Sequence, residues 1–257
     1  MAGEGRMTAA VLPALKGAPN FRDVGGLPGE GGRKIRAGRV LRSGHLGVLD
    51  GDDLASLRNW LGGGLTVVDL RGAEERVKRP CLLEEAVVHS LPIEPRVAAQ
   101  LDAVAATGET PGGTHARRFM CEAYGSFARD ARPQLAQLFR HLLARAGQPL
   151  LVHCAAGKDR TGFMVAMVLA ALGVPRDVVM EDYLLTNQRV TPRDTGRFAP
   201  DILHALGTVY PEYLQSAWAV IDGEFGGIDS YLEKGVGLSQ SDREALRAVL
   251  LDTAGSD

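Results

Sequence analysis

The sequence has few cysteines, and their number and spacing indicate whether the protein works in a reducing or an oxidising compartment. Cys81, Cys121 and Cys154 are the three cysteines of the 257 residues, and they form neither a CxxC pair nor an even-numbered disulfide framework. Free thiols in a reducing compartment are therefore expected, which favours a cytoplasmic location. Secretion by a route that needs no signal peptide stays open as an alternative.

Excess charge and long apolar runs are missing as well. A formal net charge of −2 leaves no basic field for nucleic acid or an anionic membrane, so any anion site must be local. The apolar run "AAVLPAL" near the N-terminus is too short for a signal peptide or a membrane span, and it contains a proline. The following histidines show no metal-ligand spacing: His45, His89, His115, His141 and His204. We therefore expect no nucleic-acid partner, no integral membrane segment, no metal and no other cofactor.

What the sequence does contain is an alternation of strand-like and helix-like segments. Three apolar runs are typical of buried strands: 65–72, 87–93 and 149–153. Three segments have helical spacing: 49–61, the end of 125–145, and 160–173. The Gly-rich segments 20–26 and 29–44 predict a small antiparallel hairpin. The alternation favours an α/β fold with a central, mostly parallel sheet flanked by helices.

The C-terminal third has a mostly helical pattern that continues to about residue 254. We expect a flexible tail at 1–16 and a single domain over 17–257, with a helical elaboration at about 176–235. Part of it, 191–217, could form a lid over a pocket, and helical core is an equally good interpretation.

The most informative stretch is "LLVHCAAGKDRTGF", in which Cys154 ends an apolar run and Arg160 opens a helical pattern. A nucleophile at the end of a strand, followed by a tight loop into a helix N-terminus, makes a cradle for an oxyanion. Small residues at 155–157 would let the backbone approach such an anion closely. The guanidinium of Arg160 could bind two phosphate oxygens at once.

The positive electrostatic field of the helix N-terminus and of Arg160 would also act on the thiol of Cys154. Helix N-termini and cations favour the thiolate form of a cysteine, so we expect a thiolate that attacks phosphorus and forms a phosphocysteine, which water then hydrolyses. The hydroxyl of Thr161 could bond to the sulfur and ease its departure. His153 is expected to bond to the backbone and fix the loop.

Other interpretations of this loop are weaker. A lone cysteine after an apolar run is usually a buried small hydrophobe, and a lone arginine on a first helical turn is usually solvated. A nucleotide phosphate loop does not fit, because Asp159 follows Lys158 where GxxxxGK[ST] requires serine or threonine. A rhodanese-like sulfurtransferase and a non-catalytic phosphate-binding module remain as alternatives from other classes.

The pattern His153-Cys154-x5-Arg160-Thr161-Gly162 resembles the signature of cysteine-dependent protein tyrosine phosphatases. The form "HCAAGKDRTG" is similar to a bacterial and fungal subgroup of tyrosine and dual-specificity phosphatases that includes enzymes acting on phosphoinositides. "NFRDVGG", "LRSGHL", "VVDLRGAEER" and "DYLLTN" extend the likeness over roughly 18–254.

The resemblance implies a phosphatase that hydrolyses phosphotyrosine in protein. Phosphoserine, phosphothreonine or a phosphoinositide is the alternative substrate. The catalytic residues would be Cys154, Asp159 and Arg160. The phosphate-binding loop would consist of Ala155, Ala156, Gly157, Lys158, Arg160 and Thr161.

Three carboxyl groups are candidates for the general acid that protonates the leaving oxygen. Asp159 is favoured because the resemblance implies an acid in the loop, although a first-turn aspartate would also suit the helix dipole. Asp130 lies upstream, where many tyrosine phosphatases carry the acid, but a helix start would also explain it. Asp69 ends the strand "TVVD" and could reach the same edge of the sheet, with Arg71 as its structural partner.

Two roles stay open at this point: that of Lys158 in substrate choice, and that of Cys81 and Cys121 in oxidation. A second cation in the loop would suit a substrate with more than one phosphate, but a solvated lysine on the rim is as good an interpretation. Cys81 or Cys121 could form a disulfide with an oxidised Cys154, and burial is the preferred interpretation for both.

Overall fold

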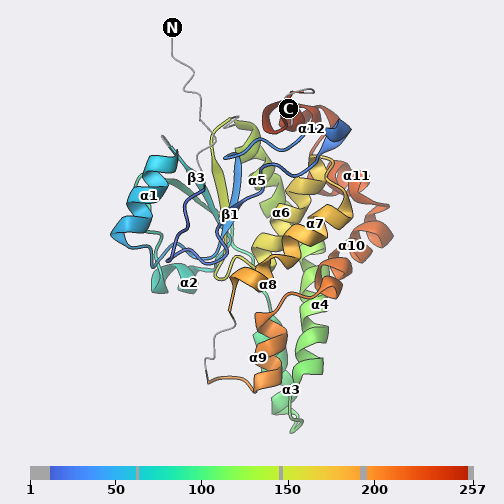
Figure 1. Ribbon diagram of the computed structural model, residues 1–257. Helices are drawn as coiled ribbons and strands as arrows, with labels where there is room; N and C mark the ends of the chain where they lie inside the picture. Colours follow the sequence, from blue (N-terminus) through green and yellow to red (C-terminus); the bar gives the residue numbers. More distant parts are fainter. Residues whose placement is uncertain (1–11, 62–63, 145–146, 192–195, 254–257) are drawn as a thin grey trace.

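The computed structural model describes residues 12–61, 64–144, 147–191 and 196–253. Figure 1 shows a central sheet with helices on both faces. The strands are β1 (Arg22–Asp23), β2 (Val40–Ser43), β3 (Thr66–Asp69), β4 (Val87–Ser90) and β5 (Leu150–His153). They lie in the order β1-β2-β5-β3-β4, with β1 antiparallel to β2 and the other pairs parallel. The predicted mostly parallel α/β fold and its antiparallel N-terminal hairpin are confirmed.

Both faces of the sheet are buried at its centre, which explains the continuous apolar runs of β3 and β5. The edge strand β4 is largely exposed, so the expected burial of this run is wrong. Leu41, Leu151 and Val67 are neighbours in register and contact one core cluster, together with Leu57 of α1 (Gly51–Leu61). Alternate positions such as Val152 belong to the larger cluster on the other face. Successive side chains of a strand point to opposite faces, so both clusters are anchored by the same strands.

The larger cluster lies beneath three long helices, α4 (Gly113–Asp130), α5 (Arg132–Ala144) and α6 (Asp159–Ala171). Helix α6 is buried on nearly all sides, with Phe163 and Met167 fully inaccessible, because it is apolar around its whole circumference. It follows β5 directly, so the centre of the sheet positions the start of this helix (Figure 1).

The remaining helices follow α6. They are α7 (Arg176–Leu184), α8 (Thr186–Arg189), α9 (Pro200–Gly207), α10 (Pro211–Phe225), α11 (Ile228–Ser230), the π-helix η2 (Tyr231–Val236) and α12 (Gln240–Leu250). Tyr213 and Leu214 of α10 are buried in the main core, which supports the core interpretation for this part of 191–217. Residues 192–195 of that stretch lie outside the described residues. No helix in the described part of the chain is both long and apolar enough to span a bilayer.

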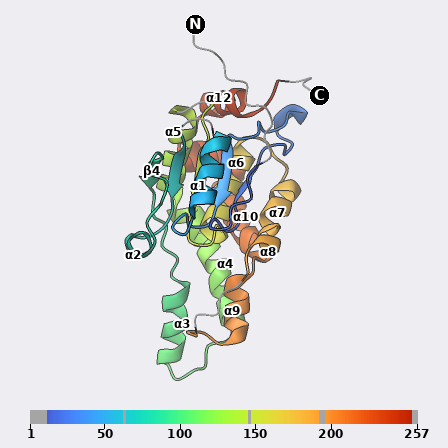
Figure 2. The ribbon, with the colours of Figure 1, turned by 60° about the vertical axis from the view of Figure 1, so that its left-hand side comes forward.

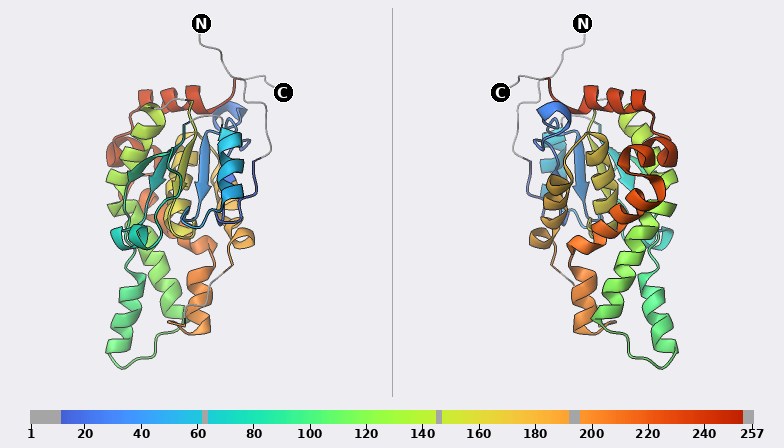
Figure 3. Two further views of the ribbon diagram at one scale, coloured as in Figure 1. Left: turned by 90° about the vertical axis from the view of Figure 1, so that its left-hand side faces the viewer. Right: turned by 90° about the vertical axis from the view of Figure 1, so that its right-hand side faces the viewer.

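Part of the helical structure was not predicted. The expected helix in 125–145 is two helices, α4 and α5, separated at Ala131. Pro133 has no N–H to donate to a preceding turn, so the chain restarts there. Helix α3 (Val97–Ala106) was missed because only Val97 and Leu101 are buried, which leaves little helical periodicity. Figures 2 and 3 show α3, the first half of α4 and α9 extending together beyond one end of the sheet.

The N-terminal segment is attached earlier than expected. Residues 1–11 of the predicted tail lie outside the described residues, but Leu12 and Leu15 pack against the α1-side cluster. The backbone N–H groups of Lys16 and Gly17 donate to the carboxylate of Asp53 at 2.9 and 2.7 Å. Packing and hydrogen bonds therefore hold residues 12–17 against the α1 side of the sheet. Two short helices complete the fold: α2 (Ala73–Lys78) and the 3-10 helix η1 (Glu30–Gly32).

Candidate active site

The loop 154–158 connects the carboxyl end of β5 to the N-terminus of α6, as the sequence predicted. Cys154 lies at the start of this loop and its side chain is only 2% exposed. The first N–H groups of α6 have no acceptor within the helix, and the helix dipole makes this end positive. The loop is therefore suited to hold an anion next to the sulfur of Cys154.

Gly157 fixes the shape of the loop. Its φ is +68°, a backbone conformation that other residues rarely adopt. A Cβ at this position would lie 2.4 Å from the carbonyl carbon and oxygen of Ser43 in β2. The Gly157 carbonyl accepts hydrogen bonds from Asn20 Nδ2 at 2.7 Å and Arg42 Nη2 at 3.1 Å. The loop thus rests directly on the backbone of the neighbouring strand.

We predict that Gly157→Ala damages the site far more than an alanine at another left-handed glycine. Gly26→Ala is the matched control, because Gly26 has φ +86° and open space around its Cβ position. The control should lose about 1–2 kcal/mol of unfolding free energy and keep its activity. Gly157→Ala should lose more, and kcat/KM should fall about a hundredfold because the loop is displaced. Equal losses in both variants would contradict this role of the contact with Ser43.

A buried charge network lies beneath the loop. Asp182 of α7 accepts from Arg22 Nε at 2.8 Å and from Arg42 Nη1 at 2.6 Å. Burial favours the neutral form of Asp182, but the charges of Arg42 and Arg22 outweigh it and hold its pKa below the usual range. Burial, together with repulsion from Arg42, lowers the pKa of Arg22 to about 10. The Arg22 guanidinium therefore stays charged at neutral pH.

This network explains two segments that the sequence analysis quoted without assigning them a task. "NFRDVGG" supplies Asn20 and Arg22, and "DYLLTN" begins at Asp182. Asn20 also contacts Thr186 of α8 through its Nδ2 at 3.3 Å. The two segments meet under Gly157 and hold it in place. Arg42 also lies directly beneath the loop, through its bond to the Gly157 carbonyl.

Arg160 is held in position by a carboxylate from another segment. Its Nη1 and Nη2 donate to Glu75 of α2 at 2.7 and 2.9 Å, as a two-bond ion pair. Nη1 also lies 3.3 Å from the carbonyl of Ile93 and 3.4 Å from that of Leu70. Burial opposes the charge of Arg160, but the hydrogen bonds that Arg160 donates to Glu75 and the electrostatic interaction with Cys154 outweigh burial and raise the pKa of Arg160. Its orientation is thus fixed before any phosphate binds.

We predict that Glu75→Gln weakens catalysis through Arg160. The amide cannot form the two-bond ion pair, so the guanidinium loses its fixed orientation. We expect kcat/KM to fall about tenfold or more, with a higher KM for phosphorylated substrates. Glu74→Gln on the same helix is the control, because the Glu74 side chain is 91% exposed. Equal values of kcat/KM for the two variants would show that the ion pair between Glu75 and Arg160 does not contribute to catalysis.

Asp159 has three polar contacts at the first turn of α6. Lys158 Nζ lies 2.8 Å from each of its carboxylate oxygens. The hydroxyl of Tyr124 from α4 donates to Asp159 Oδ1 at 3.0 Å, and the hydroxyl of Tyr183 from α7 lies 2.7 Å from that of Tyr124. Tyr183 therefore belongs to a hydrogen-bond chain that ends at Asp159.

The other two acid candidates lie in different surroundings. Asp69 is 1% exposed and accepts from Arg71 Nε and Nη2 at 2.9 and 2.7 Å. Burial favours its neutral form, but the bonds from Arg71 and the nearby His153 keep its pKa below the usual range, which suits a structural ion pair. Asp130 is exposed at the end of α4, not at a helix start, and lines a separate cavity with Glu94.

Two smaller predictions about the loop have different outcomes. His153 Nδ1 lies 3.1 Å from the carbonyl oxygen of Cys154, so the predicted backbone bond is confirmed. Burial lowers the pKa of His153, which keeps its ring neutral. The predicted bond between Thr161 and the sulfur is wrong for this structure, because Thr161 Oγ1 is buried without a hydrogen-bond partner.

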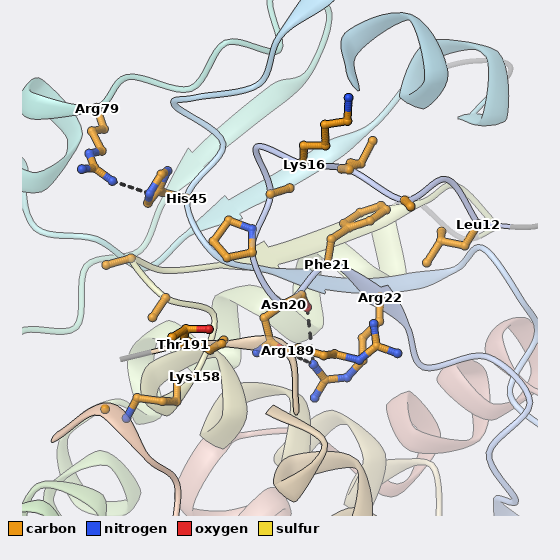
Figure 4. A pocket seen from close by; sticks show the side chains of 18 of the residues that line it. Leu12, Lys16, Asn20, Phe21, Arg22, His45, Arg79, Lys158, Arg189 and Thr191 are labelled. Atoms are coloured by element: carbon orange, nitrogen blue, oxygen red, sulfur yellow. Dashed lines mark hydrogen bonds between the residues drawn. The ribbon is translucent and has the colours of Figure 1, made fainter. Parts of the chain in front are cut away.

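A cavity of about 1170 Å³ opens beside the loop. It meets the loop at Ala155, Ala156 and Lys158. Figure 4 shows the N-terminal wall of this cavity with Lys16, Phe21 and Arg22, and the pair His45 and Arg79 at one side. Arg79 Nη1 lies 2.5 Å from His45 Nε2. Apolar side chains complete the lining: Leu12, Leu15, Phe198, Leu203 and Leu206.

The comparisons with known proteins agree with this geometry. A model of the tyrosine phosphatase family matches residues 13–252. A Cupriavidus necator protein named as a candidate tyrosine-protein phosphatase is 36% identical over 83% of this chain and 80% of its own length. The triple specificity protein phosphatase PtpB of Mycobacterium tuberculosis is 34% identical over 92% of this chain and 98% of its own. A tyrosine-protein phosphatase of Nostoc commune is 28% identical over 86% and 76%. The chain belongs to the tyrosine phosphatase family.

Proposed function

We propose that this enzyme hydrolyses phosphotyrosine in proteins through a phosphocysteine intermediate, with Cys154 as the nucleophile. The observation that carries the proposal is that the loop after β5 and the first turn of α6 bring Cys154, Asp159 and Arg160 together. The buried sulfur, only 2% exposed, favours a long aryl phosphate over a short alkyl one. The N–H groups of 155–160 and the guanidinium of Arg160 hold the phosphoryl oxygens.

Two steps complete the reaction. In the first, the thiolate of Cys154 forms a bond to phosphorus while the bond to the tyrosine oxygen breaks, and the acid form of Asp159 gives its proton to that oxygen. In the second, the Asp159 carboxylate takes a proton from water as the water attacks phosphorus. The S–P bond then breaks, phosphate leaves and the thiolate returns. Neither step needs a metal, so turnover should continue in the presence of a chelator.

A second candidate activity is the hydrolysis of phosphoinositides. The cavity of about 1170 Å³ is larger than a phosphotyrosine side chain needs, and it combines cationic and apolar walls. Lys158 and Arg189 could bind further phosphates, while Phe198 and Leu206 offer contacts for acyl chains. The name of the Mycobacterium tuberculosis relative, a triple specificity phosphatase, is compatible with a broad substrate range.

The proposal is tested by the dependence of rate on the leaving group. We predict that Asp159→Asn lowers kcat/KM, which reports the first step, about a hundredfold on phosphotyrosine peptide and much less on an activated aryl phosphate, whose leaving group needs little protonation. Asp130→Asn is the matched control and should behave as wild type. A panel of phosphoinositides in vesicles, assayed beside the peptide, ranks the two substrate classes. Equal losses of Asp159→Asn on both leaving groups would remove Asp159 as the acid.

A further inference from the structure

We propose that Tyr124 is a positioning residue for Asp159, and that Tyr183 fixes Tyr124 in turn. The two phenols form a chain from α7 through α4 to one oxygen of the carboxyl group in the loop. This inference rests on the proposed role of Asp159 as the general acid. It adds two residues that lie outside the phosphate loop and do not touch the substrate phosphate.

The direction of the hydrogen bonds follows from the acceptor at the end of the chain. A carboxylate accepts only, so Tyr124 donates its one proton to Asp159 Oδ1 at 3.0 Å. The hydroxyl of Tyr124 can then only accept from Tyr183, 2.7 Å away. Both rings are buried, and burial together with the charge of Asp159 raises the pKa of each phenol well above its usual value. Both therefore remain neutral and keep these bonds over the whole working pH range.

The rings cannot easily move. Tyr124 packs against the rings of Phe127, Tyr183 and Tyr213, with centroids 5.3 to 6.1 Å apart. Tyr183 also lies against the backbone of α6, because a Cβ on Gly162 would lie 3.0 Å from its ring. A side chain locked by packing holds its partner within the narrow range of positions that proton transfer needs.

The consequence is that the two oxygens of Asp159 differ. Oδ1 receives the fixed hydroxyl of Tyr124, while Oδ2 has Lys158 Nζ, which lies 2.8 Å from both oxygens. The Asp159 side chain is 25% exposed, whereas Tyr124 is fully buried. Oδ2 is thus the oxygen on which the transferred proton resides, and Tyr124 holds the carboxyl group so that this oxygen faces the leaving group.

The test is a set of single and double variants assayed on two substrates. Tyr124→Phe removes the hydroxyl and keeps the ring. We expect kcat on phosphotyrosine peptide to fall about tenfold, with KM unchanged and little loss on an activated aryl phosphate. In an Asp159→Asn background, Tyr124→Phe should cause no further loss, because its effect passes through that carboxyl group.

The pH profile gives a readout that a purely structural role would not change. Tyr124→Phe removes a hydrogen bond that favours the ionised form of the carboxyl group, so the high-pH limb of the kcat/KM profile, which reports the acid, should shift upward. The other groups that act on Asp159 remain in place, namely Lys158, Arg160, Tyr183 and Tyr213. The low-pH limb, set by other groups, should not move.

Tyr231→Phe is the matched control, since this buried phenol donates to the carbonyl of Ala128 at 2.9 Å, one turn further along α4. It should keep both the leaving-group dependence and the pH limbs of the wild type. If Tyr124→Phe fails to fold, Tyr183→Phe tests the same chain and should show the same pattern with smaller losses.

Two results would overturn the inference, and they are distinguishable from failure of the proposed function. If Tyr124→Phe loses as much on the activated substrate as on the peptide, it does not act through the acid. If its loss multiplies with that of Asp159→Asn, the two act separately. An Asp159→Asn variant that keeps the wild-type rate on phosphotyrosine would instead remove the acid assignment itself, and this inference with it.

Discussion

Cys154→Ser should abolish phosphate release while the protein keeps its fold. The hydroxyl of serine does not ionise near neutral pH, so the field of the loop cannot produce a nucleophile from it. We expect a loss of about 10⁴-fold or more in kcat on every phosphomonoester. The variant should still bind phosphotyrosine peptide, because Arg160 and the loop N–H groups are unchanged. Titration calorimetry with a phosphopeptide and its unphosphorylated form measures this binding.

The other two cysteines provide the controls for this result. Cys81→Ser and Cys121→Ser remove thiols that are only partly buried and lie in other parts of the fold. Both variants should keep wild-type turnover. A Cys154→Ser variant with substantial activity would mean that another group attacks phosphorus. Turnover of thiosulfate by the wild type, with no release of phosphate from phosphate esters, would instead support the sulfurtransferase alternative.

Asp182→Asn should be the most damaging substitution for stability. Asparagine has the shape of aspartate but leaves the buried guanidinium groups of Arg22 and Arg42 without a counter-charge. Loss of one partner of a buried ion pair typically costs about 3–5 kcal/mol. The melting temperature should therefore fall by about 10 °C. Activity should fall as well, because Arg42 also supports the carbonyl of Gly157.

Acid stability gives an independent measure of the same network. The folded-state pKa of Asp182 lies below that of an unfolded aspartate, about 3.9. The ion pairs therefore contribute fully above that pH, and their contribution is lost as the pH falls through the folded-state pKa. Urea unfolding between pH 7 and pH 3 should show a steeper loss of unfolding free energy in the wild type than in Asp182→Asn.

Asp222→Asn is the control for Asp182→Asn. It breaks an ion pair with Arg176 whose side chains are 46% and 49% exposed. Solvent screens such a pair, so the change in unfolding free energy should stay within about 1 kcal/mol. Similar losses of unfolding free energy in the two variants would show that burial does not increase the contribution of the Asp182 network to stability.

The sequence predicted best what depends on neighbouring residues. The loop from Cys154 to Arg160 is contiguous, and its chemistry follows from residue types at fixed spacing. The strands β3 and β5 and the helix α6 were found because each is a continuous apolar run, buried on both faces of the sheet or around the whole helix. The apolar run at β4 was also found, although this edge strand is largely exposed. In contrast, α3 has only a narrow buried stripe, and the two-residue strand β1 was found only as part of a Gly-rich hairpin.

What supports the loop could not be predicted, because its parts are distant in the chain. Arg22 and Asp182 are separated by 160 residues, Glu75 and Arg160 by 85, and Tyr124 and Asp159 by 35. Each of these side chains has an ordinary explanation in its local sequence. From the local sequence, for example, Glu75 would simply form an ion pair with the nearby Arg71. Only the fold brings it against Arg160.

The most direct test of the account is to trap and locate the covalent intermediate. Asp159→Asn should lack the base of the second step, while an activated aryl phosphate needs little protonation in the first step, so acid quenching of this variant during turnover of such a substrate should accumulate phosphoenzyme. We predict that peptide mass spectrometry finds the phosphate on Cys154, and that Cys154→Ser forms none. Phosphate on any other residue, or steady turnover by the Cys154→Ser variant, would contradict the central claim that this thiolate is the nucleophile.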